Sequence, residues 1–167
     1  MNDFTLLIKT LQQFGNILWI NQYFDLLKRL LVELDLADTD PRLALTLSKN
    51  QTLPVNIGQR YVLKPLIGES IRCIVPADFE ENAVSARFLG YFSPNTTRDA
   101  KWVQFYFPTG IHIPEVLYTA FLTASETILS KTKKSGYRKY HNSLLYHFTM
   151  EPTVRSEVLA ELKQLRG

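Results

Sequence analysis

The apolar residues of this chain change their spacing along the sequence, from a helical period to an alternating one and back again. Between residues 17 and 36 they recur every three or four positions, whereas in several segments between residues 43 and 107 they alternate with polar residues. The first spacing lines one face of a helix and the second lines one face of a strand. Helices should therefore lie before and after a central sheet, which predicts an α+β fold.

An N-terminal helix pair is expected, because residues 3–14 and 17–36 each carry an apolar stripe and are separated by Gly15 and Asn16. We expect the longer stripe to pack on the domain's own sheet, with a subunit interface as the alternative. Strands are expected at residues 43–48, 60–66, 70–75, 86–92 and 101–107. Their short links, such as the three residues Ile67, Gly68 and Glu69, predict an antiparallel meander of about five strands.

Two to three C-terminal helices should follow the sheet. A helical stripe runs from Pro114 to Lys131, a second begins at Pro152, and the short apolar segment 143–150 is expected to be helical as well. The 167 residues are 46% hydrophobic and 21% charged, which is typical of one globular domain. We therefore expect a single domain over residues 1–167, either as a whole protein or as the N-terminal recognition module of a larger one.

The sequence also indicates where the protein resides. Cys73 is the sole cysteine, so an internal disulfide is excluded and a reducing compartment is favoured. The longest apolar segment, residues 14–36, is interrupted by polar and charged residues that a lipid-spanning helix does not tolerate. These features predict a cytoplasmic protein without a membrane partner.

Positive charge is concentrated in the second half of the chain. Residues 1–83 hold eight basic and ten acidic side chains, whereas residues 84–167 hold eleven and six. No acidic residue lies between Glu126 and Glu151, an interval that contains the cations Lys131, Lys133, Lys134, Arg138 and Lys139 among the tyrosines Tyr137 and Tyr140. Cations neutralise phosphates and tyrosine rings stack on unpaired bases, so this interval predicts a nucleic-acid contact. The alternative is a solvated loop that complements a helix dipole.

Three further residues could extend this surface. Arg98 and Lys101 lie between or within the last two expected strands, and alternation places Trp102 on the same face as Gln104 and Tyr106. An aromatic residue on that face could stack on a base, although a half-buried strand would have the same pattern. The interpretation as ordinary turn and core residues is the alternative for all three.

The sequence contains no phosphate-binding loop, zinc-protease motif or serine-hydrolase motif. We therefore predict no catalytic residue, metal or cofactor. A third hypothesis is a small enzyme whose site is built from Asp78, Glu80, His112 or His141.

The sequence thus favours a non-catalytic nucleic-acid-binding domain, with DNA preferred over RNA. Its layout is loosely similar to the recognition modules that precede motor or nuclease domains in DNA-targeting defence systems. That similarity implies a targeting module of a larger DNA-processing or restriction protein, with further domains or subunits as partners. The main alternative is a protein-interaction or oligomerisation domain that docks through the Leu-rich helix 17–36, around Leu27, Leu30 and Leu34.

Overall fold

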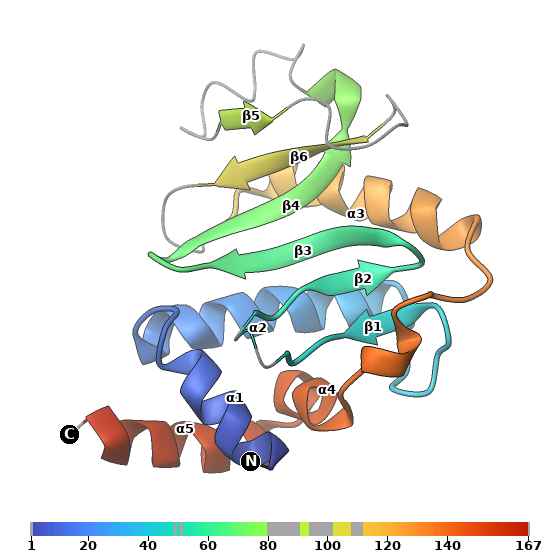
Figure 1. The fold of residues 1–167 in the computed structure, drawn as a ribbon. Coiled ribbons are helices and arrows are strands. Elements are labelled where there is room, and N and C mark those ends of the chain that lie inside the picture. Colours follow the sequence, from blue (N-terminus) through green and yellow to red (C-terminus); the bar gives the residue numbers. More distant parts are fainter. Residues whose placement is uncertain are drawn as a thin grey trace.

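The computed structural model describes residues 2–48, 50, 52–79, 91–93, 102–107 and 112–166 (Figure 1). In chain order the elements are α1 (Asp3–Leu11), α2 (Ile17–Glu33), β1 (Leu43–Leu45), β2 (Val55–Ile57), β3 (Arg60–Leu66), β4 (Ser70–Pro76), the 3-10 turn η1 (Ala77–Phe79), β5 (Tyr91–Ser93), β6 (Trp102–Phe107), α3 (Glu115–Ser130), the 3-10 turn η3 (Arg138–Tyr140), α4 (Ser143–Met150) and α5 (Pro152–Arg166). Two helices, an antiparallel sheet and three further helices confirm the predicted α+β class.

The strands form one antiparallel sheet in the order β1-β2-β3-β4-β6-β5. The first four strands form an antiparallel meander, in which β3 and β4 make the expected hairpin. The last two strands depart from the meander, because β6 pairs with β4 and lies between β4 and β5. Strand β2 was not predicted, since three residues between Pro54 and Gly58 are too few to show an alternation.

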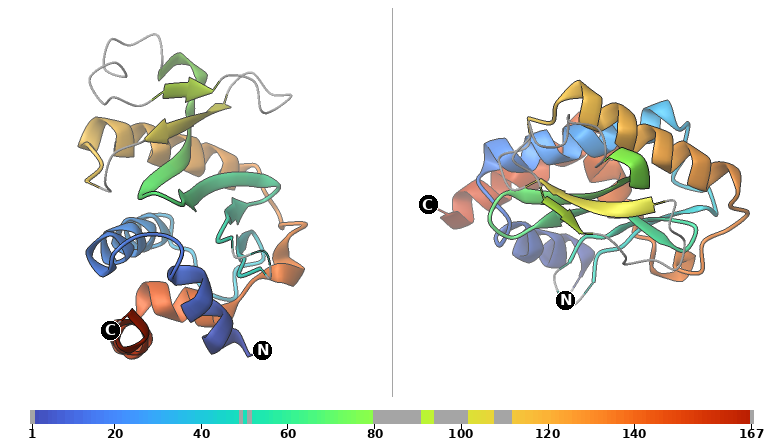
Figure 2. Two further views of the ribbon diagram at one scale, coloured as in Figure 1. Left: turned by 60° about the vertical axis from the view of Figure 1, so that its left-hand side comes forward. Right: turned by 90° about the horizontal axis from the view of Figure 1, so that it is seen from above.

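One face of the sheet is covered by helices. Figure 2 shows α2 and α3 on the same side of the strands, with the opposite side of β3, β4 and β6 free of any described helix. Leu27, Leu30 and Leu34 of the Leu-rich segment are all buried in this core. The predicted packing of α2 within its own domain is therefore confirmed, and this apolar stripe is not exposed for docking. Among the described residues, no helix combines the length and apolarity that a membrane crossing requires.

A β-bulge in β3 decides which of its side chains face away from the helices. Val55 of β2 pairs with Leu63 and the next residue pairs with Tyr61, so Val62 is an extra residue in β3. Val62 and Leu63 are consequently both buried, while Tyr61 and Lys64 are not. The bulge thus restores the alternation with Tyr61 and Lys64 on the same, helix-free face.

The remaining helices pack together below the sheet in Figure 1, where α1 lies beside α4 and α5. Leu7 and Leu11 of α1, Phe148 of α4 and Leu162 of α5 are buried at this end of the core. Both α1 and α2 are preceded by an N-cap asparagine, Asn2 and Asn16, whose side chain accepts a hydrogen bond from a backbone N–H of the first turn.

Candidate nucleic-acid interface

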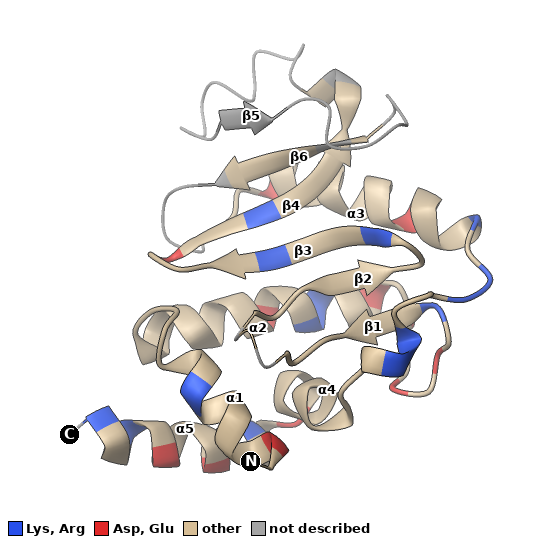
Figure 3. Ribbon diagram, in the orientation of Figure 1, with Lys and Arg blue, Asp and Glu red and all other residues tan. Residues whose placement is uncertain are grey.

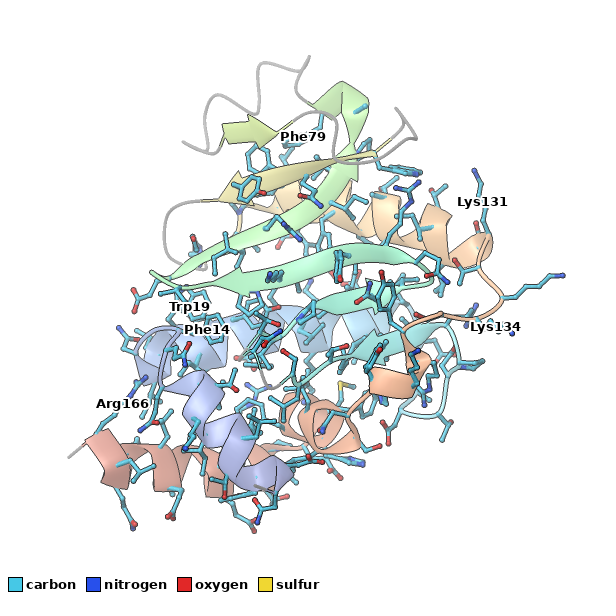
Figure 4. All side chains as sticks on the ribbon, viewed as in Figure 1. Phe14, Trp19, Phe79, Lys131, Lys134 and Arg166 are labelled. Carbon is cyan, nitrogen blue, oxygen red and sulfur yellow. The ribbon has the colours of Figure 1, made fainter. Side chains whose placement is uncertain are left out.

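The predicted cations follow the end of α3, in a stretch that we call the basic segment (residues 131–141). In Figure 3 Lys and Arg positions, coloured blue on the ribbon, lie close together on the connection after α3 and on η3. Figure 4 shows Lys131 and Lys134 pointing outward from the connection, away from the body of the protein. Lys131, Lys133, Lys134 and Lys139 are all exposed.

The basic segment is fixed to the first strands of the sheet. The backbone N–H of Ser135 donates to Pro41 O at 2.8 Å, and its hydroxyl donates to Gly58 O. Gly58 has a φ of 61°, and a side chain there would press against Thr132, so glycine permits this close approach. At the far end, the N–H of Asn142 donates to Leu45 O at 2.8 Å. The cations are therefore presented by a segment that is attached at both ends.

Arg138 is placed differently from the lysines. Its guanidinium donates to three backbone carbonyls, those of Asp38 at 2.6 Å, Leu43 at 2.8 Å and Asp40 at 3.0 Å. These bonds connect η3 to the turn before β1. A predicted phosphate contact by Arg138 stays untested, but these carbonyls already engage both terminal nitrogens of its guanidinium.

The four lysines have no ion pair with any carboxylate in the described part of the chain. Lys139 Nζ lies 5.1 Å from the centroid of the Tyr140 ring, and Tyr140 is 53% exposed. An ammonium group beside an accessible ring is the combination that a phosphate and an adjacent base require. Charge and aromatic surface therefore coincide at this point of the segment.

Two carboxylates lie near the basic segment, and both already have other partners. Asp40 accepts hydrogen bonds from the Arg42 guanidinium, and these bonds are the main reason why the pKa of Asp40 is lowered. Asp38 contacts His141, with 2.7 Å between Oδ1 and Nε2. Burial is the largest single effect and would raise the pKa of Asp38, but hydrogen bonds from His141 and Ser143, together with charge interactions with His141 and His147, lower it overall. Neither carboxylate thus neutralises the lysines through a direct contact.

The other predicted contact residues are distributed as follows. The Tyr137 ring lies 5.7 Å from the Tyr61 ring, tilted by 42°, so it rests on the sheet. Trp102 is 9% exposed and lines a depression of about 260 Å³ together with Lys131, Arg60 and Ile128. That exposure leaves little of the indole available for stacking. Arg98 and Lys101 lie outside the described residues.

The structure separates the histidines of the enzyme hypothesis. His112 lies on the surface beside Arg29 and Glu115, whereas His141, at the end of the basic segment, accepts a hydrogen bond from the backbone N–H of Leu45 in β1. Glu80 and the side chain of Asp78 lie outside what the structure describes. Within the described residues, no three His, Cys, Asp or Glu side chains are grouped as metal ligands.

Sequence reasoning missed a second group of cations and rings, on the helix-free face of the sheet. Lys64 and Arg72 were visible in the sequence, but only the strand register shows that they face one another. The signal that could have found them is the alternation of β3 and β4, provided that the bulge at Val62 had been foreseen.

Comparison of the chain with protein-family models, with curated proteins and with solved structures found no match.

Proposed function

We propose that this chain is a non-catalytic nucleic-acid-binding domain that contacts the phosphate backbone through Lys131, Lys133, Lys134 and Lys139. DNA is the favoured ligand. One observation carries the proposal: four exposed ammonium groups, with no ion pair to any carboxylate that the structure describes, stand on one segment that continues from α3 and is hydrogen-bonded to the first strands and their turns at Ser135 and Asn142. Attachment reduces the conformational entropy that a flexible basic loop would lose on binding. A role as targeting module of a larger DNA-processing or defence protein stays a prediction.

A salt titration tests the electrostatic part of the proposal. Each phosphate neutralised on duplex DNA contributes about −0.9 to the slope of log affinity against log salt concentration. Four lysine contacts should therefore give a slope of about −3 to −4. Fluorescence anisotropy with labelled duplex and single-stranded DNA measures both the affinity and this slope.

The decisive variant is the triple substitution K131Q/K133Q/K134Q, which removes three positive charges from the basic segment. We expect its affinity for DNA to fall at least about tenfold and its salt slope to become shallower. The matched control K9Q/K28Q/K163Q removes the same charge from α1, α2 and α5 and should retain most of the binding. Wild-type protein that binds no DNA at low salt, or a triple variant that binds like wild type, would contradict the proposal. Circular dichroism should show both variants folded.

A further inference from the structure

A row of side chains crosses the helix-free face of the sheet. Lys64 on β3 pairs with Arg72 on β4, which in turn pairs with Tyr106 on β6. Paired residues of antiparallel strands project from the same face, so these three side chains are neighbours. The bulge at Val62 brings Tyr61 onto this face, and Tyr137 of the basic segment contacts Tyr61. We call these five residues the sheet-face cluster.

The two cations of the cluster are directly opposite one another. Like charges at paired positions of neighbouring strands repel, and sheets usually avoid the arrangement. Within the ranges that the structure describes, neither Lys64 nor Arg72 forms an ion pair with a carboxylate. Burial and the nearby charge of Arg72 lower the pKa of Lys64. An anionic ligand between the two groups would relieve this repulsion.

Two aromatic rings lie near the Arg72 guanidinium. Its central carbon lies 6.0 Å from the ring centroid of Tyr61 and 6.0 Å from that of Tyr106. Tyr61 is 39% exposed, and no described helix covers this part of the sheet (Figures 1 and 2). Rings on either side of a cation suit a ligand that alternates flat groups with negative charges.

We infer that the sheet-face cluster binds single-stranded nucleic acid, with a phosphate between Lys64 and Arg72 and a base stacked on Tyr61 or Tyr106. Unpaired bases expose the flat faces that stacking needs, whereas a duplex keeps its bases stacked on one another. The inference rests on the proposed function and deepens it. Tyr137 makes the cluster continuous with the basic segment, so one strand can contact both surfaces.

The test compares three labelled probes: single-stranded oligothymidine, a duplex of the same length and a base-free phosphodiester strand. The double variant K64Q/R72Q should bind the single strand at least about tenfold more weakly and the duplex about as wild type does. Because the variant removes a repulsive pair, its urea midpoint should equal or exceed that of wild type. The variant Tyr61→Leu should weaken binding of oligothymidine about tenfold and leave the base-free strand unaffected.

Failure of this inference can be distinguished from failure of the proposed function. If K64Q/R72Q binds the single strand like wild type while K131Q/K133Q/K134Q loses binding, the inference is wrong and the proposed function stands. If K64Q/R72Q weakens duplex and single strand equally, the cluster is a general phosphate contact and the single-strand assignment is wrong. If wild type binds none of the three probes, both proposals are wrong.

Discussion

His141 illustrates how individual side chains hold the basic segment in place. Its Nδ1 accepts a hydrogen bond from the backbone N–H of Leu45 at 3.1 Å, so Nε2 carries the proton and donates to Asp38 at 2.7 Å. A second proton on Nδ1 would face the Leu45 N–H. Burial lowers the pKa of His141, although the hydrogen bond to Asp38 opposes that shift. The pair is therefore a neutral imidazole with a carboxylate at neutral pH.

We predict that His141 makes the protein less stable as the pH falls below the usual histidine pKa of 6.5. In that range the unfolded chain binds a proton that the folded protein accepts only at lower pH, so the free energy of unfolding decreases. Urea unfolding should show that the free energy of unfolding of wild type exceeds that of His141→Asn near pH 7.5 and that this difference shrinks towards about pH 5. His112→Asn is the control and should keep the wild-type profile, because His112 is exposed. A difference in free energy of unfolding between wild type and His141→Asn that stays the same at every pH would contradict the prediction.

Arg138 shows the limit of sequence reasoning for single residues. The sequence identified it correctly as part of a basic interval, and the four lysines of that interval are indeed exposed. The partners of Arg138 are carbonyls 95 to 100 residues earlier in the chain. Backbone carbonyls have no residue type, so no motif can reveal such a contact.

At the scale of elements, Arg155 joins three helices. Placed in the first turns of α5, it donates to Phe148 O at 3.1 Å and to Thr149 O at 2.6 Å, near the end of α4, and it also contacts Asp25 of α2. The carbonyls at the end of a helix have no partner within that helix and need an external donor. Arg155 supplies this donor at the tight junction between α4 and α5.

We predict that Arg155→Met lowers the free energy of unfolding by about 1–3 kcal/mol, because two partly buried carbonyls lose their donor. The exposed ion pair with Asp25 should contribute little of that loss. Lys163→Met, at an exposed position on the same helix, should change stability by less than about 0.5 kcal/mol. Urea unfolding monitored by circular dichroism measures both variants. Equal urea midpoints for Arg155→Met and Lys163→Met would show that Arg155 does not stabilise the junction.

The elements themselves could be predicted to different degrees. All five α-helices were predicted: four of them repeat their apolar spacing over two or more turns, whereas α4 is a short, mostly apolar segment whose spacing alone does not distinguish a helix from a strand. Strand β2 could not be predicted from the sequence. The position of β6 between β4 and β5 could not be predicted either. Strand order depends on which edges meet in space, and alternation within a strand carries no information about its neighbour. For the same reason the sequence could not place Tyr106 beside Arg72, although the predicted hairpin of β3 and β4 held the signal for the pair of Lys64 and Arg72.

At the scale of the whole molecule, Cys73 reports on opening of the sheet. It lies on β4 between β3 and β6 and is 1% exposed, and burial raises the pKa of its thiol to about 12. The reactive thiolate is therefore scarce in the folded protein.

We predict that a thiol reagent modifies Cys73 only after the sheet opens, so that the labelling rate follows the global unfolding equilibrium in low urea. The control is Lys163→Cys in a Cys73→Ala background, which should react at once because that site is exposed. Rapid labelling of Cys73 in native buffer, independent of urea, would show that β4 opens locally.

The contact between α1 and α5 has a consequence for biosynthesis. Arg166 donates to the carbonyls of Leu11 and Gln12, and α5 packs against α1. A ribosome produces α1 first and α5 more than 130 residues later. The newly made α1 therefore lacks its α5 partner until the end of α5 leaves the exit tunnel, and apolar surface exposed during such an interval is prone to aggregation and is one reason why chaperones exist.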